Sequence, residues 1–152
     1  MVRLEAEAID PGALLDGFCR GRCDVGAVVS FTGLTRAHTN GAEVSQLSLD
    51  AYPGYTEKVM AELEAETRAR FVVADVLVAH RWGELAVGEP IVFVAVAAEH
   101  RRAAFEAADF LMDQLKTRAP FWKRETGADG DRWIEARAQD HADAGRWKSG
   151  TP

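Results

Sequence analysis

The sequence has few cysteines and no long apolar run, and each absence excludes a class of protein. Its 152 residues include two cysteines, Cys19 and Cys23, with no second Cys or His pair spaced to complete a zinc site. They are either reduced thiols near a helix end or a redox or sulfur-handling pair. No apolar run approaches the roughly 18–20 residues that span a membrane. The charges within Met1–Glu5 leave no room for the apolar segment of a secretory signal, so we expect a cytoplasmic protein without a membrane partner.

The sequence also lacks the basic excess of a protein that binds nucleic acid. Its 18 Lys and Arg residues against 24 Asp and Glu residues give a net charge of −6. Its positive charge is unevenly placed, with local basic clusters at 100–102 (His-Arg-Arg) and at 116–124. A local basic site on an acidic chain favours a small anionic ligand.

Hydrophobic periodicity predicts one domain over residues 1–137, an α+β or α/β sandwich, followed by a polar tail, 138–152, that is loosely held. A strand is expected at 2–6 and a short helix from Pro11, with Asp10 as its N-cap. The remaining expected elements are strands at 26–31, 47–51, 72–80 and 90–98, helices at 56–70 and 101–118, and a hairpin of 121–126 with 132–136. The strands 72–80 and 90–98 are expected to be neighbours, joined by a turn at 83–90, and 33–41 is expected to be a polar loop.

Two lysines flank Pro120, where the 101–118 helix has to end. Lys116 lies at the edge of the helix's apolar stripe, so its amine is either partly desolvated and reactive or simply extended towards solvent. Lys123 follows just beyond the proline. Two lysines that meet near a helix end lower each other's proton affinity, which favours chemistry at this place.

His100 and Arg101 begin the same helix, where free backbone amides favour an anion such as phosphate; the alternative is a solvated capping cluster. Arg36, in the polar loop, is a weaker anion-binding candidate. His100 and Lys116 are 16 residues apart, about 24 Å at ~1.5 Å per residue, too far to share a small pocket within one chain. Either there are two sites or a twofold dimer brings the two ends together, and our hypothesis is the dimer.

The four tryptophans, Trp82, Trp122, Trp133 and Trp147, have two open interpretations. They either stack on a flat heterocycle or pack in the core and at interfaces. Trp122 is the one of greatest interest because it precedes Lys123.

The run Leu115–Glu125 (LKTRAPFWKRE) resembles the signature of molybdopterin synthase large subunits, the MoaE family. Asp50 departs from the glutamate expected there. The other matching segments follow in order: Phe31-Thr32-Gly33 with Arg36, Tyr52-Pro53-Gly54, His80-Arg81 with Gly83-Glu84-Leu85, Glu99-His100-Arg101, and Asp131-Arg132-Trp133 with Glu135 and Arg137. The resemblance covers about residues 25–137, nearly the whole chain.

The resemblance implies an α/β-hammerhead type of fold with an additional small antiparallel subdomain. It implies a homodimer within a heterotetramer, in which a small ubiquitin-like sulfur carrier docks at each end. The carrier's Gly-Gly tail, activated as a thiocarboxylate, would enter the lysine pocket. Two sulfur transfers would then convert cyclic pyranopterin monophosphate (precursor Z) to the dithiolene of molybdopterin, with no metal or other cofactor in this subunit.

The site residues follow from the same resemblance. Lys116 would act in acid–base or transient covalent chemistry, assisted by Lys123. The substrate-binding residues would be Arg36, His100, Arg101 and Arg137, with His100 and Arg101 supplied by the partner chain, and an apolar wall formed by Phe31 and Met112.

Three rival functions remain open at this point. One is a non-catalytic scaffold or regulator that only holds a peptide tail, although two lysines exceed what tail binding needs. A phosphate-ester enzyme lacks a P-loop, a metal-ligand cluster and a Ser-His-Asp arrangement in the sequence. A nucleic-acid module conflicts with the negative net charge.

Overall fold

Of two four-stranded sheets in the described residues, the one with the longer strands lies at the centre of the fold. The computed structural model describes residues 1–39, 41–128 and 130–148. The strand order is β1-β6-β8-β2, with β1 parallel to β6 and the other neighbours antiparallel. The strands are β1 (Val2–Glu5), β2 (Ala27–Leu34), β6 (Asp75–Arg81) and β8 (Pro90–Ala98). The expected pairing of 72–80 with 90–98 is confirmed as β6 with β8, although β6 begins only at Asp75.

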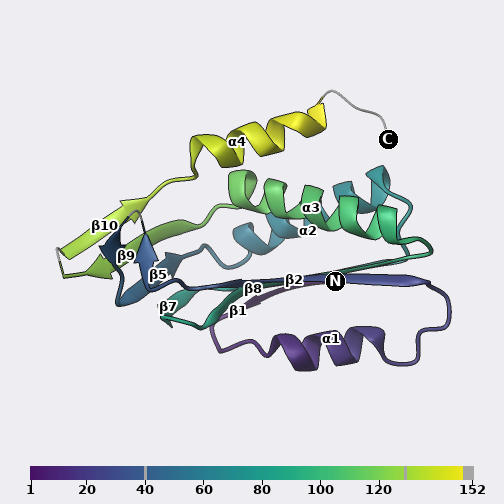
Figure 1. Ribbon diagram of the computed structural model, residues 1–152, viewed down its shortest axis with the longest axis horizontal. Helices are drawn as coiled ribbons and strands as arrows, with labels where there is room; N and C mark the ends of the chain where they lie inside the picture. Colours follow the sequence, from purple (N-terminus) through teal and green to yellow (C-terminus); the bar gives the residue numbers. More distant parts are fainter. Residues whose placement is uncertain (40, 129, 149–152) are drawn as a thin grey trace.

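Helices cover both faces of this sheet, which explains the continuous apolar runs of its central strands. Figure 1 shows α1 (Pro11–Cys19) on one face and α2 (Tyr55–Arg70) and α3 (Arg101–Arg118) on the other. Alternate residues of β6 point to opposite faces of the sheet. Val76 and Val78 belong to the hydrophobic cluster with α2 and α3, and Leu77 and Ala79 belong to the cluster with α1. Asp10 caps α1 as predicted, since its carboxylate accepts from the Ala13 N–H at 3.0 Å.

A second, fully antiparallel sheet lies at one end of the molecule (Figure 1). Its order is β10-β9-β5-β7, formed by β5 (Gln46–Asp50), β7 (Gly83–Ala86), β9 (Trp122–Gly127) and β10 (Gly130–Ile134). The predicted hairpin is confirmed as β9–β10, and β9 pairs on its other side with β5. Helices combined with largely antiparallel sheets confirm the α+β class.

Two segments predicted as turn or loop contain strands. β7 lies within the expected turn 83–90, where Leu85 is buried against Leu47 and Leu49 of the small sheet. The expected loop 33–41 holds the end of β2 and β3 (His38–Thr39), which pairs with β4 (Ala42–Glu43). Segments of two to four residues are too short for an alternation pattern to identify.

The prediction of a loosely held tail is wrong for residues 138–148. They form α4 (Ala138–Gly145) and a 3₁₀ turn, η1 (Arg146–Lys148), and α4 packs on α3. Trp147 anchors the segment: its indole N–H donates to the buried Asp113 carboxylate at 2.7 Å, and its ring meets Phe71 and Phe110 edge-on. Residues 149–152 of the predicted tail lie outside the described residues.

Candidate active site

The corner between α3 and β9 brings the two lysines together. α3 ends at Arg118, ahead of Pro120, and the chain turns through Phe121 into β9. Thr56, fully buried at the start of α2, donates its hydroxyl to the Pro120 carbonyl at 3.4 Å. Lys116, in the last turn of α3, therefore lies close enough to Lys123, the second residue of β9, for its charge to act on it.

Lys123 is the more buried of the two amines. It pairs with Leu49 of β5, so its side chain lies on the face of the small sheet that carries the fully buried Leu49. Burial lowers the pKa of Lys123, the positive charge of Lys116 lowers it further, and the carboxylate of Asp140 partly restores it. The sequence-based expectation that the two lysines depress proton affinity is thus confirmed at Lys123.

Lys116 makes an ion pair that the sequence did not predict. Its Nζ lies 3.3 Å from Oδ1 of Asp140 in α4, and its side chain is 49% exposed. Burial opposes ionisation of Asp140, yet the backbone N–H of Arg137 and the charge of Lys116 hold its pKa below the usual value. Of the two alternatives for Lys116, the structure shows the one in which the side chain extends towards solvent, and the more buried amine is that of Lys123.

A buried histidine completes the surroundings of Lys123. The ring of His80 stacks on Phe121 with centroids 3.9 Å apart, and its Nδ1 lies 2.8 Å from the Arg81 carbonyl oxygen. Burial lowers the pKa of His80 to about 4, against the effect of that hydrogen bond, and the charge of Lys123 lowers it as well. His80 is neutral near pH 7, with its proton on Nδ1 because a carbonyl can only accept.

The predicted phosphate-binding pair lies at the other end of α3. His100 is the N-cap residue and Arg101 the first helical residue, and both are exposed. The helix length separates them from Lys116 by about 24 Å at ~1.5 Å per residue. One chain therefore does not bring the two predicted groups together.

The other predicted residues divide between the lysine corner and the surface. Met112 lies one turn before Lys116 and is partly buried against the core. Arg137 is adjacent to the site: its N–H donates to Asp140 at 2.9 Å. Phe31 on β2 is 42% exposed, and Arg36 is exposed in the loop that follows β2.

Sequence reasoning missed Asp140 and His80 as members of this site. Asp140 lies in the segment taken for a loose tail, although an acid three residues into a helix is a usual N-terminal signal. His80 is part of a matched motif but lies inside an apolar strand, where nothing in the sequence marks it as close to Lys123.

The arrangement can bind anions and move protons at one place. A buried amine with lowered proton affinity, beside a second amine with its own counter-ion, can neutralise an anionic substrate and exchange a proton with it. Cys19 and Cys23 are exposed free thiols. The described part of the chain holds no group of three His, Cys, Asp or Glu side chains placed to bind a metal ion, and no helix in it is long and apolar enough to cross a membrane.

Three comparisons with known proteins, by family model, by sequence and by structure, all find MoaE proteins or molybdopterin synthase subunits. Residues 4–118 match the family model described as "MoaE protein". A "Molybdopterin synthase catalytic subunit" from Caulobacter vibrioides is 51% identical over 147 residues, 97% of each chain. The solved structure of a molybdopterin biosynthesis MoaE protein from Burkholderia ambifaria has a TM-score of 0.82 at 38% identity and covers 99% of each chain. A chain from the complex of subunits 1 and 2 of molybdopterin-converting factor from Helicobacter pylori (TM-score 0.72, 21% identity, 91% of each chain) shares the fold.

Proposed function

The chain belongs to the MoaE family, and we propose that it is the catalytic subunit of a molybdopterin synthase, a sulfurtransferase of molybdenum cofactor biosynthesis. The observation that carries the proposal is the meeting of Lys116 and Lys123, the second with a lowered pKa. The sulfur donor is the C-terminal thiocarboxylate of a small ubiquitin-like carrier with a Gly-Gly end. The acceptor is cyclic pyranopterin monophosphate, and the product is the molybdopterin dithiolene.

The charges of the site suit this pair of substrates. A thiocarboxylate and a phosphorylated pterin are both anions, so a site with two amines and Arg137 nearby attracts both. Lys116, half exposed and reachable by the carrier tail, is the first candidate for acid–base or transient covalent work. Lys123 neutralises developing charge and, when deprotonated, accepts a proton.

The remaining substrate contacts require a second copy of the chain. We propose a homodimer in which His100 and Arg101 of one chain reach the Lys116 corner of the other and bind phosphate or pterin, with Arg36, Phe31 and Met112 completing the pocket. Each end of the dimer takes one carrier, giving a heterotetramer in the cytoplasm. The fold of each chain is proposed to be the α/β-hammerhead type, with the small sheet as its additional subdomain.

The test is to mix the protein with thiocarboxylated carrier and cyclic pyranopterin monophosphate and to measure dithiolene formation. We expect Lys116→Ala to abolish product while the complex with the carrier persists, and Lys58→Ala, an exposed lysine on α2, to have no effect. Near-normal turnover of the Lys116 variant would favour a non-catalytic scaffold of the same fold. Arg101→Glu should weaken pterin binding more than carrier binding; equal effects would contradict a phosphate contact.

A further inference from the structure

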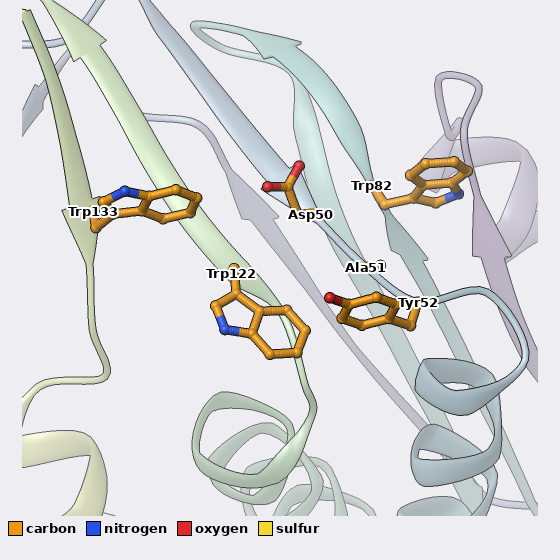
Figure 2. A pocket seen from close by; sticks show the side chains of 6 residues that line it. All are labelled: Asp50, Ala51, Tyr52, Trp82, Trp122 and Trp133. Carbon is orange, nitrogen blue, oxygen red and sulfur yellow. The ribbon is translucent and has the colours of Figure 1, made fainter.

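An acidic aromatic cup lies on the face of the small sheet opposite Lys123. It is a cavity of about 420 Å³ lined by Asp50, Ala51, Tyr52, Trp82, Trp122 and Trp133. Figure 2 shows the Asp50 carboxylate projecting among the rings of these aromatic residues. None of the residues assigned to the lysine site lines it.

Strand register places the cup and the lysine site on opposite faces of one strand. Asp50 pairs with Trp122 across β5 and β9, and Leu49 pairs with Lys123. Directly paired residues share a face, and successive residues alternate between faces. Trp122 and Asp50 thus face outwards while Lys123 faces inwards, with only one peptide bond between Trp122 and Lys123.

The aromatic rings of the cup are unusually open to solvent for their size. Trp122 is 46% exposed, Trp133 is 60% exposed and Tyr52 is 63% exposed, and the rings of Tyr52 and Trp122 meet edge-on at 5.2 Å. Solvent-facing tryptophan and tyrosine side chains are the residues most enriched at energetically important positions of protein interfaces.

The carboxylate of Asp50 makes the cup suitable for a positively charged side chain. Within the described residues Asp50 makes no ion pair, and the arginine on the same sheet face, Arg124, is bonded to Asp131 at 3.1 Å. The Asp50 carboxylate attracts a cation, and the faces of neighbouring aromatic rings favour one as well, as the guanidinium of Arg124 already shows 5.9 Å from the centroid of Trp133. The same carboxylate disfavours a phosphorylated pterin, which the lysines on the other face attract.

We propose that this cup anchors an arginine or lysine side chain of the small carrier subunit. This inference rests on the proposed function. A second copy of the chain is the less suitable occupant, because the proposed dimer partner must reach Lys116 on the α3 side of the sheet. A carrier anchored at Trp122 has Lys123 one residue away on the same strand, so a short extended tail of ~3.3–3.6 Å per residue can pass around the sheet to the amines.

The first experiment measures the binding of the cognate carrier, with a free C-terminal carboxylate, by calorimetry. We expect Asp50→Asn and Trp122→Leu each to raise the Kd by about tenfold or more, the usual effect at an interface anchor. Glu62→Gln, which removes the same charge from the exposed face of α2, is the matched control and should leave the Kd unchanged. Unchanged binding by both cup variants overturns the anchor, as does a change in dimerisation instead of carrier affinity.

The second experiment needs no carrier. Protein labelled with ¹⁵N-tryptophan is titrated with Nα-acetyl-arginine amide and, separately, with its uncharged isostere Nα-acetyl-citrulline amide. We expect the indole signals of Trp82, Trp122 and Trp133 to move with the arginine compound only, and to stop moving in Asp50→Asn. Equal shifts with both compounds, or shifts that persist in the variant, overturn the proposal. Failure of dithiolene formation would overturn the proposed function, whereas this titration would still show whether the cup binds an arginine side chain.

Discussion

Replacing Trp147 by alanine tests whether the C-terminal segment is a fixed part of the fold. The centroid of the indole lies 6.0 Å from that of the Phe71 ring and 5.5 Å from that of the Phe110 ring, both in edge-on contact. The indole N–H donates a hydrogen bond to the carboxylate of Asp113. Each aromatic pair contributes about 0.5–1.5 kcal/mol beyond the area it buries. A fully buried Trp→Ala change costs about 3–5 kcal/mol, and Trp147 is only partly buried. We therefore expect the free energy of unfolding to fall by about 2–3 kcal/mol.

Urea unfolding at fixed protein concentration measures this loss. With an m-value of about 2 kcal/mol/M, the midpoint should fall by about 1–1.5 M. Trp133→Ala is the matched control, because Trp133 is 60% exposed, and its cost should stay within about 0.5 kcal/mol.

Hydrogen exchange separates local from global loss. In the Trp147 variant the amides of α4 should exchange faster than those of α3, because α4 loses its anchor while the α3 core remains. An unchanged midpoint, or α4 protection equal to that of the unaltered protein, would refute the docking of α4 that positions Asp140 beside Lys116.

Two further perturbations test the electrostatics of the site. Asp140→Asn should lower the pKa of Lys123 further and so raise the reactivity of this amine towards an acylating reagent near pH 8, measured by peptide mass spectrometry. The control is Asp143→Asn in the same helix. Equal labelling of Lys123 in the unaltered protein and both variants contradicts the coupling of Lys123 to Asp140. His80 has a folded-state pKa of about 4 against 6.5 when unfolded, so the folded protein should lose up to about 3 kcal/mol of stability between pH 6.5 and pH 4 and none above pH 6.5. His80→Gln should flatten that part of the stability profile, measured by urea unfolding, and an identical slope in both proteins would count against a buried neutral imidazole.

Much of the fold was predictable because its main elements are long and periodic. The 101–118 helix has a buried row through Ala104, Ala107 and Leu111, and its end follows from Pro120. The central strands were recognisable as apolar runs bounded by turn residues. Such signals are local, so they survive without knowledge of the tertiary structure.

The errors occurred where tertiary contacts decide the structure. β7 has four residues and becomes a strand because Leu85 fills the space beside Leu47 and Leu49. α4 contains no buried residue of its own and is held largely by two residues beyond its C-terminal end, Arg146 and Trp147, which both bond to Asp113 of α3. A helix of eight residues with no fully buried position is too short to be recognised from its own sequence, because most of its stability comes from tertiary contacts.

The different burial of the two lysines follows from the elements that carry them, because Lys116 is on a helix and Lys123 is on a strand. Position on a helix left open whether Lys116 is desolvated or extends towards solvent, and the structure shows it half exposed and paired with Asp140. A strand gives Lys123 no such freedom, because β9 is paired on both sides and its alternation directs the side chain inwards beside Leu49. The backbone therefore holds the Lys123 amine in a buried place that disfavours its charged form, and the nearby carboxylate of Asp140 partly offsets this effect. A site of this kind offers one amine that is paired with a carboxylate and a second amine whose pKa is lowered by burial, which suits the binding of an anion and the exchange of a proton at one place.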